Sequence, residues 1–214
     1  RLIRQRIHRL KGQIEEVRKH RALYRQQRRE SGIPIVALVG YTNAGKSTLL
    51  NALSHAGVFV EDKLFATLDP TTRRLTLPDK SVVLVTDTVG FIRKLPPTIV
   101  TAFRATLEEL EEASLLLHVA DLASHNAPEQ CQAVEDILAD LNLMNKPCIT
   151  ALNKIDLLLG SDKTWDEASA ISYLSHCCDT VDENMVLVSA TKRWGLNKLL
   201  ELINQVLIKT SQPA

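Results

Sequence analysis

The stretch IVALVGYTNAGKSTLL, residues 35–50, decides the fold. Its first five residues are apolar and largely β-branched, which is typical of a buried strand, and its end has a helical pattern. Between them, GYTNAGKS at residues 40–47 fits the pattern G-x-x-x-x-G-K-[ST]. Glycines let the backbone N–H groups of such a loop point at phosphate oxygens, and the helix that follows adds its positive N-terminal end. The sequence therefore predicts a phosphate-binding loop between a strand and a helix.

The residues of this loop are the first candidate site residues. Lys46 would bring a positive charge to the β and γ phosphates, and the Ser47 hydroxyl is placed to ligate Mg²⁺. The expected nucleotide contacts are Asn43, Ala44, Gly45, Lys46, Ser47 and Thr48. ATPases, nucleotide kinases and GTPases all use such a loop, so other motifs must identify the nucleotide.

Beyond residue 33, short apolar runs alternate with longer amphipathic stretches, the pattern of an α/β protein with a mostly parallel sheet. Six strands are expected, at residues 35–39, 73–77, 81–86, 114–120, 147–152 and 185–188. Five helices are expected, at residues 46–54, 98–112, 128–141, 165–176 and 195–208. The turn residues Pro78 and Asp79 predict a hairpin between the second and third strands.

A second motif, DTVG at residues 87–90, follows an apolar run some forty residues after the phosphate-binding loop. A carboxylate there would lie at the carboxyl end of a strand beside the loop. Asp87 is therefore expected to hold Mg²⁺ through water, and the Gly90 N–H to contact the γ phosphate.

A third motif, NKID at residues 153–156, predicts the base that is recognised. The Asp156 carboxylate can accept both N1–H and the exocyclic amine of guanine, whereas adenine would leave it unpaired, and such sites discriminate by about 10⁴ to 10⁵. Lys154 is expected to pack its stem over the base, and Asn153 to brace the loop. Ser189 and Ala190 match an element whose backbone N–H contacts the guanine carbonyl. Four motifs in this order favour a GTPase over a nucleotide kinase.

Residues 33–209 resemble the G domain of the HflX family, in the Obg-HflX group of translation-factor-related GTPases. The resemblance lies in GYTNAGKS at 40–47, LFATLDPTTR at 64–73 and DTVGFI at 87–92. It implies a P-loop NTPase fold of the Ras-like type and hydrolysis of GTP to GDP as a molecular switch.

The resemblance also implies roles for residues of the second stretch. Thr67 is the switch threonine that contacts the γ phosphate and Mg²⁺, and Phe65 is a further nucleotide contact. Lys46, Thr67 and Gly90 are then the catalytic residues, and Ser47, Thr67 and Asp87 the metal-binding ones.

Residues 1–31 differ from the rest in charge. They carry a net charge of +8, which leaves −7 for the remainder. Their apolar residues recur at steps of four and three, as in a helix with a narrow apolar seam. We expect residues 1–31 to be a basic helix, the remnant of an N-terminal domain, and residues 32–214 to be the G domain. Because the chain opens with Arg1 inside the helical pattern, we expect a fragment of a longer protein.

Family members bind the large ribosomal subunit and rescue or split stalled ribosomes, so the resemblance implies a ribosomal partner and a role in rescue, splitting or assembly. A +8 helix is attracted to RNA phosphates. The alternative for residues 1–31 is a solvated helix that docks onto the missing domain. Docking and RNA binding are compatible roles for the same helix.

Ras-like enzymes place a glutamine after DxxG to orient the attacking water, but residue 91 is Phe. We expect slow intrinsic hydrolysis, with the water positioned by switch backbone, a partner or a bound K⁺. Asn43 either holds this K⁺ or only braces the loop. The alternative function is a nucleotide-gated RNA-binding or ribosome-binding module with little turnover.

The remaining expectations concern the rest of the chain. No apolar run reaches the roughly 20 residues that span a bilayer, and no signal peptide opens the chain, which predicts a cytoplasmic protein. We expect a monomer. The four cysteines lack zinc or disulfide spacing, so buried free thiols are expected. His118 is expected to be a core residue. Trp194 is expected to anchor the last helix, and an approach to the nucleotide is the alternative.

Overall fold

The computed structural model describes residues 31–54, 72–88, 110–160, 163–177 and 182–211, together with Arg6, Arg9 and Gly12. The chain divides into two compact units, Arg1–Ile33 and Pro34–Ala214. The second unit contains the sheet and is the one described below. Among the described residues, no helix combines the length and the apolar character needed to cross a bilayer.

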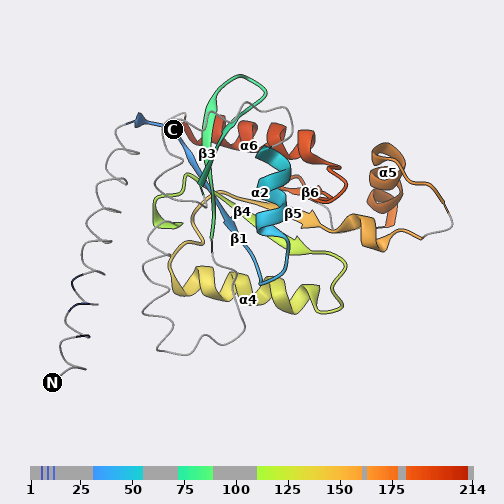
Figure 1. Ribbon diagram of the computed structural model, residues 1–214, viewed down its shortest axis with the longest axis horizontal. Helices are drawn as coiled ribbons and strands as arrows, with labels where there is room; N and C mark the ends of the chain where they lie inside the picture. The colour runs from blue at the N-terminus through green and yellow to red at the C-terminus, as the bar shows by residue number, and fades with distance from the viewer. Residues whose placement is uncertain are drawn as a thin grey trace. The chain divides into compact units, whose positions relative to one another are not determined.

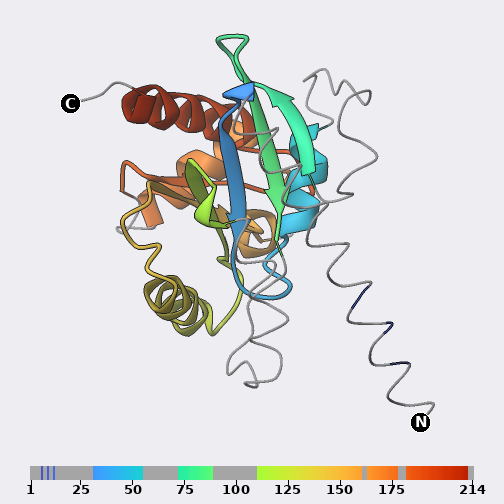
Figure 2. The same ribbon diagram turned by 90° about the vertical axis from the view of Figure 1, so that its left-hand side faces the viewer.

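The second unit is built on a six-stranded sheet with the order β2-β3-β1-β4-β5-β6 (Figure 1). The strands are β1 (Ile35–Val39), β2 (Thr72–Thr76), β3 (Val82–Asp87), β4 (Leu115–Asp121), β5 (Cys148–Asn153) and β6 (Met185–Leu187). All neighbouring strands are parallel except β2 and β3, which form an antiparallel hairpin. The turn of this hairpin projects from the end of the sheet (Figure 2). The predicted α/β fold is confirmed.

Four α-helices and one short 3₁₀ helix are described in this unit. They are α2 (Lys46–Ser54), α4 (Ala127–Asp140), α5 (Glu167–Cys177), α6 (Leu196–Ser211) and the 3₁₀ helix η1 (Ile155–Leu158). The predicted helix at residues 98–112 lies outside the described residues except for its end, where Leu110 and Glu111 are helical. The sequence patterns did not predict η1, which overlaps the NKID motif.

The sheet is covered on both faces, as its apolar strands require. One core joins α2 and α6 to one face of the sheet, through residues such as Leu49 and Ile203 packed with Leu117. A second core joins α4 to the opposite face, where Val134 packs with Leu116. Figure 1 shows α2 and α6 on one side of the strands and α4 on the other. The strand ends that carry the predicted motifs are therefore set in a rigid frame.

Element boundaries differ from the predictions where polar side chains intervene. Helix α5 begins at Glu167, two residues later than expected, because the Asp166 carboxylate accepts the Ser169 N–H at 2.8 Å and caps the helix. Strands β4 and β5 each continue one residue further than expected, to Asp121 and Asn153. Both of these polar residues thus belong to the sheet, and their positions are fixed by its pairing.

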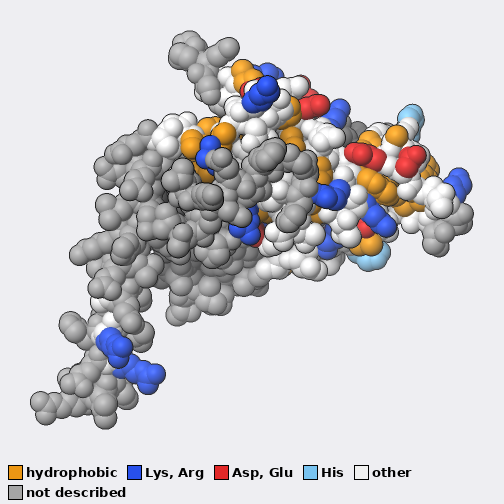
Figure 3. All heavy atoms as spheres, turned by 45° about the horizontal axis from the view of Figure 1, so that its top comes forward, with side chains coloured by type: hydrophobic (Ala, Val, Ile, Leu, Met, Phe, Trp, Pro, Cys, Tyr) orange, Lys and Arg blue, Asp and Glu red, His pale blue; other side chains and the backbone are white. Residues whose placement is uncertain are grey.

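Some apolar side chains remain on the surface. Leu157 on η1 and Tyr173 on α5 are 65% and 51% exposed, and apolar side chains show on this part of the molecule in Figure 3. Three cysteines are described, and all are free: Cys131 is half-buried, and Cys148 and Cys177 are exposed. The three thiols are free as predicted, but the expected burial is wrong for each of them.

Candidate nucleotide-binding site

The phosphate-binding loop connects β1 to α2, as the sequence predicts. Its lysine is folded back onto the loop: the Lys46 ammonium donates to the carbonyls of Gly40 and Tyr41, each at 3.0 Å. Lys46 is only 6% exposed. Burial lowers the pKa of its ammonium, whereas the charge of Asp87 acts in the opposite direction. A buried lysine ammonium in this loop is suited to bind an anion such as a phosphate group.

The serine of the loop meets the end of β3. The Ser47 hydroxyl donates to Asp87 Oδ2 at 2.5 Å, although the two residues lie 40 positions apart. The other carboxylate oxygen, Asp87 Oδ1, is buried and has no hydrogen-bond partner within the described part of the chain. The next residue is fixed as well, because the Thr88 hydroxyl donates to the Leu38 carbonyl at 2.5 Å. The structure thus brings two of the three predicted metal-binding residues together.

This pair fits a hard cation such as Mg²⁺. Hydroxyl and carboxylate oxygens are its usual protein ligands, and Mg²⁺ keeps several waters. The buried, unpaired Asp87 Oδ1 is a polar atom that a hydrated cation would satisfy. Within the described ranges, no group of three or more His, Cys, Asp or Glu side chains could hold a metal by itself. A cation here would therefore share its coordination with water and phosphate.

Asn153 joins the two halves of the site. Its side-chain amide donates from Nδ2 to the Ala44 carbonyl at 2.9 Å and accepts the Ala190 N–H on Oδ1 at 3.1 Å. The side chain is 1% exposed. Gly45 allows this contact: with φ at +96°, a Cβ there would lie 2.4 Å from Asn153 Nδ2. The amide thus connects the phosphate-binding loop with the Ser189–Ala190 element.

The third and fourth motifs also meet. The Ser189 hydroxyl donates to Asp156 Oδ1 at 2.6 Å, and its oxygen accepts the Lys192 N–H at 3.0 Å. Ser189 is fully buried, and its backbone pairs with that of Trp194 in both directions at 3.1 Å. The Asp156 carboxylate is therefore oriented by a fixed hydroxyl. The Ala190 N–H, predicted to contact a guanine carbonyl, donates to Asn153 in this structure.

Sequence reasoning missed one charged residue of this region. Asp121, the last residue of β4, accepts a hydrogen bond from the Lys154 ammonium at 2.7 Å. The signal was present, because Asp121 follows an apolar run just as Asp87 and Asn153 do, and parallel strands end at one edge of the sheet.

The remaining predicted site residues are less informative. Phe65, Thr67 and Gly90 lie outside the described residues, and so does Phe91. Asn43 and Thr48 are described: both are exposed.

His118 has the buried surroundings that its sequence context predicts, whereas the role of Trp194 as an anchor for the last helix stays a prediction. His118 lies within β4 and is 7% exposed, and burial together with the charge of Lys46 lowers its pKa to about 4. A histidine of this kind is neutral near pH 7. Trp194 is half-buried and packs against the small core around Ile155 and Leu174, just before α6 begins.

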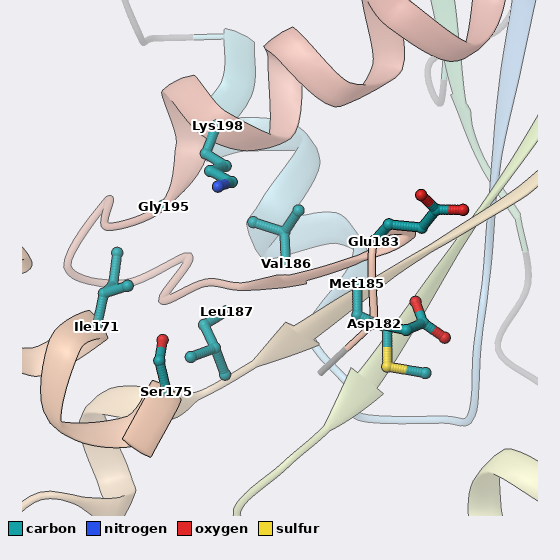
Figure 4. Close-up of a pocket in the computed structure, with 9 residues that line it drawn as sticks. All are labelled: Ile171, Ser175, Asp182, Glu183, Met185, Val186, Leu187, Gly195 and Lys198. Atoms are coloured by element: carbon teal, nitrogen blue, oxygen red, sulfur yellow. The ribbon is translucent and has the colours of Figure 1, made fainter. Parts of the chain in front are cut away.

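A cavity of about 200 Å³ lies elsewhere, at the free edge of β6 between α5 and α6 (Figure 4). Its lining includes Ile171, Ser175, Asp182, Met185 and Lys198. None of the predicted site residues lines it. The cavity is therefore separate from the strand ends that carry the motifs.

Comparison with known proteins agrees with the motifs. A family model described as "50S ribosome-binding GTPase" matches residues 35–154. The GTPase HflX of Caldanaerobacter subterraneus is 48% identical over 210 residues, which are 98% of this chain and 45% of that protein. The GTPase HflX of Escherichia coli is 48% identical over 158 residues, 74% of this chain and 37% of that protein. The chain thus spans less than half the length of these relatives.

Solved structures agree at the level of the fold. A GTP-binding protein of Sulfolobus solfataricus in complex with GDP matches with a TM-score of 0.61 and 29% identity, covering 90% of this chain and 58% of that one. Era of Aquifex aeolicus, at 23% identity and a TM-score of 0.54 over 85% of this chain and 58% of that one, shares the fold. Motifs, geometry and relatives agree: the chain belongs to the 50S ribosome-binding GTPase family that the model describes and, within it, to the HflX family.

Proposed function

We propose that this chain binds Mg²⁺ and GTP at the strand ends and hydrolyses GTP to GDP and phosphate as a molecular switch. The observation that carries the proposal is the double contact of Asn153, which joins the phosphate-binding loop to the Ser189–Ala190 element. One nucleotide can then meet both ends of the site. The matched Sulfolobus protein in complex with GDP supports this use of the fold.

The base end of the site is suited to guanine. Asp156 presents a carboxylate that Ser189 holds in place through one oxygen. Guanine offers two adjacent N–H donors to such a group, and adenine does not. A nucleotide without these donors would leave a desolvated charge unpaired, which is the basis of discrimination by orders of magnitude.

The phosphate end is suited to a triphosphate with its metal. Ser47 and Asp87 would hold Mg²⁺, with Thr67 added by resemblance, and Lys46 would face the β and γ phosphates. The metal would neutralise phosphate charge. Lys46 would add a desolvated cation, whose attraction for phosphate is stronger than in water because the group is buried.

Switching would depend on Thr67 and Gly90, whose contacts with the γ phosphate order their segments until hydrolysis releases them. Phe91 cannot orient water, so intrinsic turnover should be slow. Groups supplied by a partner can raise such rates by about 10³ to 10⁵.

A bound K⁺ is one candidate for the missing group, and Asn43, exposed in the phosphate-binding loop, would be its ligand. Turnover measured in K⁺ and in Na⁺ buffers tests this role. We expect faster turnover in K⁺. Equal rates would leave Asn43 with a bracing role only.

The matching family is described as a 50S ribosome-binding GTPase. We propose that this chain also binds the large ribosomal subunit. The second candidate function, a nucleotide-gated module that binds RNA or ribosomes with little turnover, is favoured by Phe91 alone. Phosphate release is the test. Release well beyond one equivalent, accelerated by large subunits, supports the enzyme, and release that stops at one equivalent supports the module.

A further inference from the structure

We propose that Asp121 is a positioning residue of the base site, whose carboxylate holds the head of Lys154 and so fixes the lysine stem beside the nucleotide base. The inference rests on the proposed function, because it assigns a role within the same site. It concerns a residue that none of the four motifs contains.

The sheet places the two residues at the ends of neighbouring strands. Asp121 ends β4 and is aligned with Asn153, which ends β5 and directly precedes Lys154. The next backbone group continues the pairing, since the Leu122 N–H donates to the Asn153 carbonyl at 3.0 Å. Asp121 thus stands in a fixed register beside the residue that joins the phosphate and base ends.

Both oxygens of the Asp121 carboxylate are engaged. Oδ2 accepts from the Lys154 ammonium at 2.7 Å, and Oδ1 accepts the Ala123 N–H at 3.1 Å. The two charged side chains are 15% and 24% exposed. A short ionic hydrogen bond that is largely withdrawn from water, with its carboxylate braced by the backbone, holds a lysine head in one place.

The backbone of Lys154 is also unusual. Its φ of +65° is left-handed, a conformation that few residues other than glycine adopt. Such conformations persist only where surrounding contacts impose them, and they cluster at ligand sites.

A free lysine side chain would lose much of its freedom when a base packs against its stem. With the head already bound to Asp121, this loss occurs on folding and no longer opposes nucleotide binding.

The test compares Asp121→Ala and Asp121→Asn with the unaltered 214-residue chain, using calorimetric titration with GDP and with IDP in Mg²⁺ buffer. IDP lacks the exocyclic amine, so the ratio of the two affinities reports on Asp156. We expect Asp121→Ala to weaken both nucleotides by about tenfold and to leave their ratio unchanged. Asp121→Asn keeps an acceptor for Lys154 without its charge, so it should lose less.

A double-mutant cycle with Lys154→Ala separates positioning from a general effect on the fold. If Asp121 acts through Lys154, Asp121→Ala should change GDP affinity by less than about twofold once the lysine is gone. The matched control is Ser124→Ala, which alters a side chain of the same loop that bonds Asn126 and Gln130. It should bind GDP as the unaltered chain does.

The outcomes are distinct. An unaltered chain that binds no guanine nucleotide overturns the proposed function itself. If that chain binds, the positioning role is overturned by an Asp121→Ala affinity equal to that of Ser124→Ala, by a changed GDP-to-IDP ratio, or by a loss that persists without Lys154. Should Asp121→Ala fail to fold by circular dichroism, Asp121→Asn decides, and GDP affinity equal to that of the unaltered chain overturns the role.

Discussion

Asp156 is the residue on which base selection should depend, since Ser189 holds one of its oxygens. In Asp156→Asn, the amide replaces an acceptor by a donor. We expect GDP affinity to fall by about a hundredfold. Xanthosine diphosphate, which carries an oxygen in place of the guanine amine, should bind more tightly to the variant than to the unaltered chain.

Calorimetric titration with both nucleotides measures the change. Asp166→Asn is the control, because Asp166 caps α5 through Ser169 and belongs to no predicted motif. It should leave both affinities unchanged. An Asp156→Asn variant that still prefers GDP to the original degree would contradict the assignment.

Ser47 gives a second prediction at the scale of one side chain. Its hydroxyl bonds Asp87 Oδ2, beside the unpaired Oδ1. We expect Ser47→Ala to reduce the gain in GDP affinity that Mg²⁺ provides by about 10- to 100-fold. Titrations in Mg²⁺ and in EDTA give this gain directly.

Ser54→Ala is the matched control in the same helix, because the Ser54 hydroxyl donates to the Leu50 carbonyl. It should keep the full effect of Mg²⁺. If both variants respond to the metal alike, Ser47 has no part in holding it.

Strand β4 contains a buried titratable group, and stability should therefore depend on pH. The pKa of His118 is lowered from its ordinary 6.5 to about 4. Between these values the unfolded chain binds the proton more readily, so the free energy of unfolding should fall as pH drops from 6.5 towards 4, by at most about 1.4 kcal/mol per pH unit. Urea unfolding across this range measures the slope.

His118→Gln keeps a polar side chain of similar size that does not titrate. Its unfolding free energy should depend less on pH than that of the unaltered chain between pH 4 and 6.5, and equal slopes would exclude His118 as a source. Acidic residues contribute to both slopes alike, so the comparison isolates the histidine.

The start of α6 depends on a glycine. Gly195 has φ at +74°, and a Cβ there would lie 2.1 Å from the Leu187 carbonyl oxygen. We expect Gly195→Ala to lower the free energy of unfolding by about 2 to 4 kcal/mol. The alanine would be strained at this positive φ, and the backbone near Leu187 would have to move to make room for its Cβ.

Gly32 is a matched control for the strain alone. Its φ is +64°, and no atom of the described part of the chain lies within 4 Å of the position of a Cβ. Gly32→Ala should cost about 1 kcal/mol. Chemical unfolding of both variants gives the comparison. Equal losses of unfolding free energy would show that the close approach to Leu187 adds little to the cost.

Elements with a clear period were predictable from the sequence. The apolar run of β1 and the helix that opens at Lys46 fall on the predicted residues, 35–39 and 46–54, because local pattern and burial agree there. The motifs also fall at strand ends. Helix α5 was displaced because its cap at Asp166 is a side-chain contact that periodicity does not register.

Some contacts between segments far apart in the chain were not predictable. The pairing of Asp121 with Lys154 depends on the register of β4 and β5, which a single sequence does not specify. Lys154, which directly precedes the 3₁₀ turn of η1, adopts a left-handed conformation, and no propensity rule favours lysine there. The sequence therefore indicated which residues lie at the site, but it did not indicate all of the side-chain contacts between them.

At the scale of the whole molecule, charge should govern the proposed interaction with ribosomes. Residues 1–31 carry +8, and binding through RNA phosphates releases counterions. We expect affinity for large subunits to fall by at least about tenfold between about 50 and 200 mM salt. Co-sedimentation at several salt concentrations measures the slope.

A variant that lacks residues 1–31 provides the comparison. It should retain GDP binding, because the predicted nucleotide contacts lie beyond residue 42, and it should show a weaker salt dependence. If the slope is unchanged without these residues, they contribute nothing to the electrostatic attraction.

The Asn153 amide has a further consequence for the ligands that the chain can accept. Because one buried side chain spans from the Ala44 carbonyl to the Ala190 N–H, the separation between the two ends of the site is fixed before any ligand arrives. Selection by length then accompanies selection by base. Analogues in which the base and the first phosphorus lie further apart than in a natural nucleotide could contact only one end of the site.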